Sequence, residues 1–185
     1  MAVSEPKYVV VSHSNTYETR LYESTIVAET VVESDFEGAG SMAFQILADY
    51  IFGNNQSKTK IDMTAPVSQI PISEKIEMTA PVTQLKKLNG HLVQFTMPEG
   101  FTLETLPIPN DSRVQLRKIP ARKVAVYKYS GSWSESRYKS KLAEFNSELL
   151  KDNVTTVGEP IFARFNSPLQ FWFLRRNEIW QEVKN

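Results

Sequence analysis

Lys60-Ile-Asp-Met-Thr-Ala-Pro-Val-Ser-Gln69 is followed in this sequence by a near-identical segment, Lys75-Ile-Glu-Met-Thr-Ala-Pro-Val-Thr-Gln84. Only two positions differ, one acid for another and one hydroxyl residue for another. Each copy opens with alternating apolar and polar residues, which predicts a short strand with one buried face. A proline then follows. Because proline has no N–H to donate to a ladder, we expect an edge, a bulge or a corner there.

The methionines of the two copies, Met63 and Met78, admit two interpretations. Apolar residues at every second position usually pack in a core, and methionine adapts well to irregular core gaps. Alternatively, the two thioethers and the neighbouring Pro66 and Pro81 line a groove for a flat apolar ligand. The repeat by itself leaves both interpretations open.

Composition excludes several classes of function. The 185 residues contain no cysteine, which rules out thiol chemistry, thiolate metal sites and disulfides. Lysine plus arginine equals aspartate plus glutamate at 21 each, so no net field favours nucleic acid as a partner. No stretch has the length and apolarity of a signal peptide or membrane span, so we expect a cytoplasmic protein of one domain, residues 1–185. Its oligomeric state is left open.

The pattern of apolar residues predicts strands and two helices. Residues 40–52 have apolar side chains at helical spacing, including Phe44, Leu47 and Ile51, and end at a glycine. Ser132-Trp-Ser-Glu135 is read as a capping box before a second helix. The strands are expected at 8–11, 17–32, 92–97, 114–117, 123–129, 161–165, 171–174 and 179–183.

The order of elements is strands, helix, strands, given twice, which predicts an internal duplication. Arg20 with Arg117 and Val27 with Val124 share one offset, since 117 − 20 and 124 − 27 both equal 97. The halves are expected at roughly residues 8–100 and 101–185. Two helices cannot cover both faces of so many strands, so we expect an α+β domain with a strongly curved antiparallel sheet, closing toward a distorted barrel.

The sequence offers no arrangement of catalytic residues. It has no nucleophile elbow, phosphate-binding loop, dinucleotide fingerprint or zinc-protease motif. The two histidines, His13 and His91, lie in polar turns and are expected to be solvated. We therefore expect a noncatalytic protein without a metal site built from side chains at ligand spacing. Its tryptophans are expected mainly to anchor packing.

Four motifs along the chain resemble those of the SOUL, or heme-binding-protein, family. They are Tyr17-Glu-Thr-Arg-Leu-Tyr22, the Lys60-Ile-Asp-Met-Thr-Ala-Pro-Val67 segment, Gln94-Phe-Thr-Met-Pro98, and Asn166-Ser-Pro168 with Arg176-Asn-Glu-Ile-Trp180. The doubled segment is similar to bacterial members. The resemblance implies a distorted antiparallel β-barrel of two pseudo-symmetric halves, each with one flanking α-helix, as in ligand-sensing domains of drug-responsive transcription activators.

The resemblance also implies noncatalytic binding of heme or a related tetrapyrrole, in an apolar groove beside the first helix. Carried over to this sequence, the binding residues are expected to be Phe44, Leu47, Ile51, Met63, Phe171 and Phe173.

Two positions depart from the family pattern. Some vertebrate members have a histidine proposed as an iron ligand where this chain has Leu21, and some have a lysine near the groove where it has Asp49. Heme is therefore expected to bind weakly or without histidine ligation, held by apolar burial with arginine or lysine at its propionates. The alternatives are a sensor or carrier of other hydrophobic small molecules, and an interaction module without a ligand.

Overall fold

The computed structural model describes residues 4–57, 73–166 and 169–184. Its helices are α1 (Phe36–Ile51), α2 (Glu135–Lys151) and the short 3-10 helix η1 (Trp172–Leu174). Its strands are β1 (Tyr8–His13), β2 (Glu18–Tyr22), β3 (Thr25–Val32), β4 (Asn55–Gln56), β5 (Val82–Lys87), β6 (Gly90–Thr96), β7 (Ile108–Pro109), β8 (Gln115–Ile119), β9 (Arg122–Ser130), β10 (Thr156–Arg164) and β11 (Arg176–Val183).

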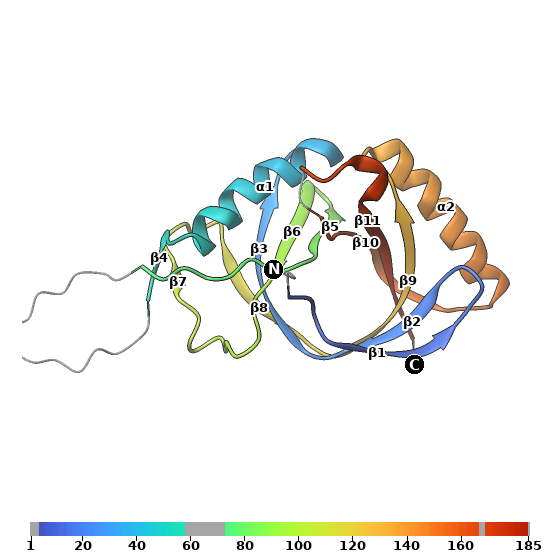
Figure 1. Cartoon of the computed structure of the whole chain (residues 1–185), viewed down its shortest axis with the longest axis horizontal. Helices are drawn as coiled ribbons and strands as arrows, with labels where there is room; N and C mark the ends of the chain where they lie inside the picture. Colours follow the sequence, from blue (N-terminus) through green and yellow to red (C-terminus); the bar gives the residue numbers. More distant parts are fainter. Residues whose placement is uncertain (1–3, 58–72, 167–168, 185) are drawn as a thin grey trace, which may run out of the picture.

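Nine strands form one antiparallel sheet in the order β1-β2-β9-β11-β10-β5-β6-β3-β8, and β4 pairs with β7 in a separate two-stranded sheet. The large sheet curls into a half-barrel, with α1 and α2 side by side on its outer surface (Figure 1). The predicted α+β class, with a curved antiparallel sheet and two flanking helices, is confirmed.

The strand pairing is symmetric with respect to the predicted offset of 97. Arg20 lies opposite Val124 where β2 pairs with β9. Where β3 pairs with β8, Val27 lies opposite Arg117, the same pair with the two halves exchanged. Strand β2 of the first half thus pairs with the second half, and β8 of the second half pairs with the first, which fits two copies of one strand–helix–strand unit. The extent of the domain and its division near residue 100 stay predictions.

Each helix covers its own part of the sheet's outer surface. Under α1, Leu47 and Ile51 are buried in a cluster with residues of β3 and β6, including Ala28 and Val93. Under α2, Phe145 packs with residues of β9 and β11 in a second cluster. The period of 3.6 in each helix explains why these positions face the sheet.

A third cluster occupies the inner surface of the half-barrel. In β9, Ala125 belongs to the cluster beneath α2, whereas its neighbours Val124 and Val126 pack with Trp180 and Tyr22. Successive side chains of a strand point to opposite faces, so this third cluster lies on the side away from the helices. The sheet therefore has apolar residues on both faces.

Several predicted boundaries are wrong. Helix α1 begins at Phe36 rather than residue 40, because Asp35 caps it by accepting the Gly38 N–H at 2.7 Å. The predicted strand 17–32 is two strands, because the chain turns after Tyr22 and β3 pairs with β6 and β8 instead of β2. The capping box at 132–135 is absent, since the N-cap is Ser134 and its side chain makes no capping hydrogen bond.

Two further expectations need correction. The segment 171–174 is not a strand: it contains η1, and the side chains of the aromatic run that suggested a strand are exposed. His91 is not a solvated loop residue, because it lies half-buried in β6 and donates from Nδ1 to the Ser34 carbonyl at 3.1 Å. His13 is exposed, as expected.

The second copy of the repeated segment joins α1 to the sheet. Ile76 is buried in the cluster beneath α1, and its N–H donates to the Ile51 carbonyl at 2.8 Å. Met78 is 37% exposed, so isoleucine and methionine do not share a buried face as the alternation suggested. The strand begins at Val82, immediately after Pro81. The first copy, including Met63, lies outside the described residues.

Candidate functional site

A cavity of about 670 Å³ lies where the N-terminal half of α1, the segment before α2 and the end of β10 come together. We call it the helix-α1 cavity. Its volume is within the range of about 300–1,000 Å³ that is usual for small-molecule sites. Its lining comprises Glu37, Gly40, Ser41, Phe44, Gln45, Val82, Ser132, Trp133, Ser134, Arg164, Asn166 and Arg175.

The apolar wall of the cavity comes from α1 and β5. Phe44 is half-buried and packs against Phe95 of β6, with ring centroids 5.4 Å apart. Val82 is the first residue of β5, directly after the second copy of Met-Thr-Ala-Pro. The repeated segment therefore contributes to the site through its valine.

The opposite wall is built around Trp133. Asn177 of β11 accepts the indole N–H of Trp133 at 2.8 Å and donates to the Gly131 carbonyl at 3.0 Å, which fixes the loop before α2. Two guanidinium groups lie near the indole ring, with Cζ to centroid distances of 4.3 Å for Arg175 and 5.4 Å for Arg164. Aromatic faces attract such cations. The cavity thus combines flat apolar surface with two positive charges.

The structure brings only part of the predicted binding set together. Phe44 lines the cavity, whereas Leu47 and Ile51 are almost fully buried in the core beneath α1. Phe171 and Phe173 stack on each other at 5.7 Å and are exposed by 69% and 54%. Helical spacing identifies a whole apolar stripe, but the residues at its centre face the sheet.

Sequence reasoning missed the charged and aromatic side of the cavity. Trp133, like the other tryptophans, was expected mainly to anchor packing. Arg164 ends β10 and Arg175 follows η1, and neither belongs to a recognisable motif. Only the tertiary structure brings the two arginines close to the Trp133 ring.

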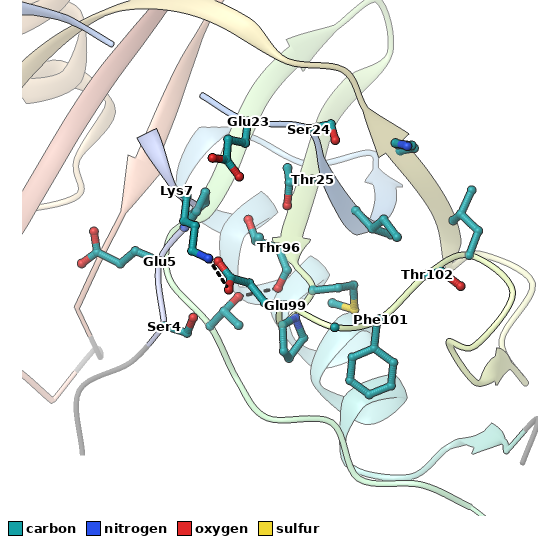
Figure 2. Close-up of a pocket in the computed structure, with 18 of the residues that line it drawn as sticks. Ser4, Glu5, Lys7, Glu23, Ser24, Thr25, Thr96, Glu99, Phe101 and Thr102 are labelled. Atoms are coloured by element: carbon teal, nitrogen blue, oxygen red, sulfur yellow. Dashed lines mark hydrogen bonds and ion pairs between the residues drawn. The ribbon is translucent and has the colours of Figure 1, made fainter. Parts of the chain in front are cut away.

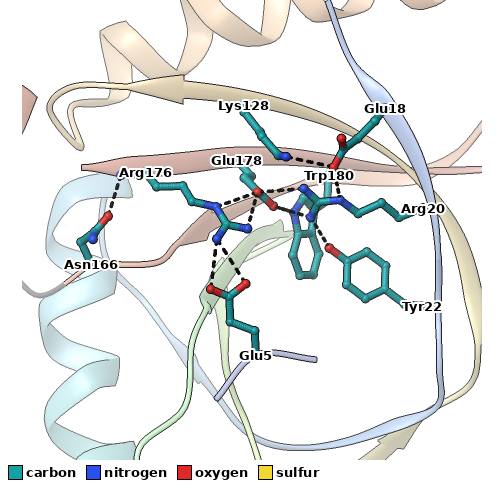
Figure 3. A network of polar contacts seen from close by, with 9 residues as sticks. All are labelled: Glu5, Glu18, Arg20, Tyr22, Lys128, Asn166, Arg176, Glu178 and Trp180. Atoms are coloured by element: carbon teal, nitrogen blue, oxygen red, sulfur yellow. Dashed lines mark hydrogen bonds and ion pairs between the residues drawn. The ribbon is translucent and has the colours of Figure 1, made fainter. Parts of the chain in front are cut away.

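Two of the motifs that carry the family resemblance, Tyr17–Tyr22 and Arg176–Trp180, meet elsewhere, in a buried network on the inner surface of the half-barrel (Figure 3). Glu178 is fully buried and accepts from both Arg20 Nη atoms at 3.0 and 3.1 Å. It also accepts from Arg176 at 2.8 Å and from the Trp180 indole at 2.6 Å. Arg20 donates to Tyr22 at 2.6 Å. Because every charge has partners, the network explains these motifs as structural.

The same alternation separates two roles within Arg-Asn-Glu-Ile-Trp. Arg176, Glu178 and Trp180 point into the inner network, whereas the intervening Asn177 points to the helix side and holds the Trp133 loop.

Leu21, at the position of the histidine in some relatives, is 45% exposed in β2. In the order of the sheet, three strands lie between β2 and β5, and β5 contributes Val82 to the cavity wall.

A second cavity, of about 520 Å³, lies beside the N-terminal segment 4–7 (Figure 2). Lys7 forms an ion pair with Glu99 at 2.8 Å, and this hydrogen bond raises the pKa of Lys7. Glu5, also in the lining, binds Arg176 of the inner network at 3.0 Å. Since these charges already have partners, this cavity is a weaker candidate for ligand binding.

Among residues 4–57, 73–166 and 169–184, no three His, Cys, Asp or Glu side chains gather in a way that could hold a metal ion. Within the same described part of the chain, no helix is long and apolar enough to cross a membrane. The described residues that line the helix-α1 cavity include no histidine or methionine.

Solved structures of other proteins share the fold. The EcmrR C-terminal domain superposes with a TM-score of 0.61 at 13% identity, covering 91% of this chain and 98% of that one. A protein described as a hydrolase from Listeria innocua superposes with a TM-score of 0.60 at 11% identity, covering 94% of each chain. At such low identity, the likeness concerns the fold alone.

Sequence comparison identifies nearer relatives. Heme-binding protein 2 of Homo sapiens is 29% identical over 178 residues, covering 91% of this chain and 78% of that protein. Heme-binding protein 2 of Mus musculus is 28% identical over the same length. The family model described as SOUL heme-binding protein matches residues 3–182. This chain therefore belongs to the SOUL heme-binding protein family.

Proposed function

We propose that this protein binds heme or a related tetrapyrrole without catalysis, and that the ligand lies in the helix-α1 cavity. One observation carries the proposal: a cavity of about 670 Å³ in which Phe44 and Trp133 provide flat apolar surface beside two arginines. A tetrapyrrole is complementary to this combination, because it has an apolar ring with carboxylates at its edge. Family membership supports the same ligand class.

The described lining residues fit the ring and carboxylates of heme better than its iron. Arg164 and Arg175 have the charge and fork geometry that suit carboxylates. No histidine or methionine is among the described lining residues to act as an axial ligand. We therefore expect apolar burial and ion pairing to provide the affinity, which gives modest binding.

A second candidate function is the binding of other amphipathic small molecules, as a sensor or carrier. The lack of an axial ligand in the described lining favours it, because such a cavity gains nothing from a metal. An interaction module without a ligand is less well supported, since that reading predicts a filled groove and the cavity is open.

The proposed site is tested by filling the cavity from one side. Ser41 and Met42 are adjacent exposed residues of α1, and only Ser41 lines the cavity. In a hemin titration followed by the Soret band, Ser41→Trp is expected to weaken binding by at least about tenfold, or about 1.4 kcal/mol. Met42→Trp introduces the same ring outside the cavity and is expected to leave binding unchanged.

Phe44→Asp gives an independent measurement, because it places a charge on the apolar wall. We expect it to abolish saturable binding, with thermal unfolding confirming that the variant folds. Binding that does not saturate, or that is the same in wild type, Ser41→Trp and Met42→Trp, would show that hemin only adheres to the surface.

A further inference from the structure

Arg164 is a guanidinium group with fewer partners than its burial calls for. Its Nη2 donates to the Gln84 side-chain oxygen at 2.7 Å. Its Nε is buried and has no hydrogen-bond acceptor. Across the described ranges 4–57, 73–166 and 169–184, no acidic group lies within ion-pair distance of it. Buried arginines normally have a carboxylate or several acceptors, because an unpaired buried charge is costly.

The surroundings of Arg164 are apolar enough to affect its ionisation. Burial lowers its pKa to about 10. The group is still protonated at neutral pH, so the cavity contains a partly desolvated positive charge. Since low local dielectric strengthens charge interactions, an anion that enters the cavity would gain more here than at an exposed arginine.

Helix α1 leaves space for this guanidinium at Gly40. A Cβ on Gly40 would lie 2.2 Å from Arg164 Nη1 and 2.3 Å from Nη2, so any side chain there would displace the group. On the other side, the Trp133 ring faces it. Gly40, Trp133 and Gln84 together hold the charged end of Arg164 at the cavity wall.

The remaining charges of the lining do not neutralise Arg164. The described lining contains two arginines and one acid, Glu37. The Glu37 carboxylate accepts the backbone N–H of Glu135 at 3.3 Å, at the N-terminus of α2. The charged groups of the described lining therefore sum to one positive charge.

We propose that Arg164 receives the anionic group of the ligand, so that the helix-α1 cavity selects amphipathic anions over neutral molecules with the same ring system. The inference rests on the proposed function, because it requires that this cavity binds small molecules. It narrows the ligand class to flat apolar molecules with a carboxylate or equivalent anion. Arg164 is then a specificity-determining residue.

The test uses two fluorescent probes that differ in one charge, 8-anilino-1-naphthalenesulfonate and the neutral N-phenyl-1-naphthylamine. In the wild type we expect the anionic probe to bind at least about tenfold more tightly, as for other buried charge-assisted contacts. Arg164→Met should reduce the preference to within about twofold. Arg164→Lys should retain part of it, because the charge is kept while the fork is lost.

Gly40→Ala moves the guanidinium without removing its charge, and it should reduce the preference even where Arg164→Met proves hard to fold. Arg113→Met is the matched control, since Arg113 is an exposed arginine paired with Asp111 outside the cavity lining. We expect this control to keep the full preference. Thermal unfolding of each variant confirms that it folds.

A preference that survives both Arg164→Met and Gly40→Ala would overturn the inference. Hemin binding that Ser41→Trp blocks, together with such an unchanged preference, would leave the proposed function standing and remove only the role of Arg164. An Arg164-dependent preference without hemin binding would support the inference and exclude heme as the ligand. If Ser41→Trp has no effect on either probe, the cavity is not the site and both proposals fall.

Discussion

Arg20, which is fully buried, and Arg164, which is half-buried, lie on opposite faces of one sheet, and their surroundings differ in kind. Arg20 is completely buried on the inner face and donates to Glu178, Glu18 and Tyr22. Arg164, on the helix face, has one hydrogen bond to a neutral amide and an unpartnered Nε. The difference separates a structural cation, whose partners are all within the chain, from one that we propose receives a ligand.

The largest expected effect is on the inner face. Arg20→Met leaves the Glu178 carboxylate buried without its main cationic partner, and breaking such a buried pair typically costs about 3–5 kcal/mol. We expect this loss in the free energy of unfolding, measured by urea denaturation with tryptophan fluorescence. Arg113→Met, at an exposed pair, should cause no measurable loss. A loss no greater than that of this control would show that the network does not stabilise the fold.

A smaller effect on the free energy of unfolding is expected on the helix face. Arg164→Met removes one hydrogen bond to Gln84, and it also removes the cost of a desolvated unpaired charge. These contributions oppose each other, so we expect the free energy of unfolding to change by less than about 1 kcal/mol. The same denaturation series provides the measurement. If Arg164→Met is as destabilising as Arg20→Met, the contrast between the two arginines fails.

The smallest effect is expected at Glu18, at the edge of the inner network, and it concerns the pH dependence of the free energy of unfolding. Burial alone raises the pKa of Glu18, but hydrogen bonds from Lys128 and Arg20 outweigh burial, so its pKa lies below the ordinary 4.5. A pKa that is lower in the folded state stabilises the protein above pH 4.5, and this stabilisation is lost as the pH falls through the folded pKa. Glu18→Gln should flatten that acid dependence by less than about 1 kcal/mol. An unchanged pH profile of unfolding would argue against the pairing.

Much of the fold was predictable because it depends on local periodicity. The helical stripe of α1 buries Leu47 and Ile51, as its spacing suggested. The offset of 97 suggested a duplication, and the strand pairing is symmetric with respect to that offset. Boundaries failed where capping decided them, as at Asp35, because a cap depends on one side chain rather than on a pattern.

The candidate site was much less predictable. The family motifs were the strongest signal in the sequence, yet Arg20, Tyr22, Arg176 and Glu178 of those motifs form the inner network rather than the cavity. At the cavity, Asn166 is part of the lining and Asn177 holds the Trp133 loop. Arg20 and Glu178 belong to two different motifs, and in this curled sheet they form a buried ion pair.

The sequence by itself determined the family, the element types and which residues of each element are apolar, because these follow from motifs and from periods of two and 3.6. Only the tertiary structure decided which polar side chains meet. Glu178 lies 158 positions from Arg20, and Arg164 lies 80 positions from Gln84. Strand order and register bring such residues together, and no local pattern specifies either. The ion pairs of Arg20 and the lack of a hydrogen-bond acceptor for Arg164 Nε are therefore properties of the fold.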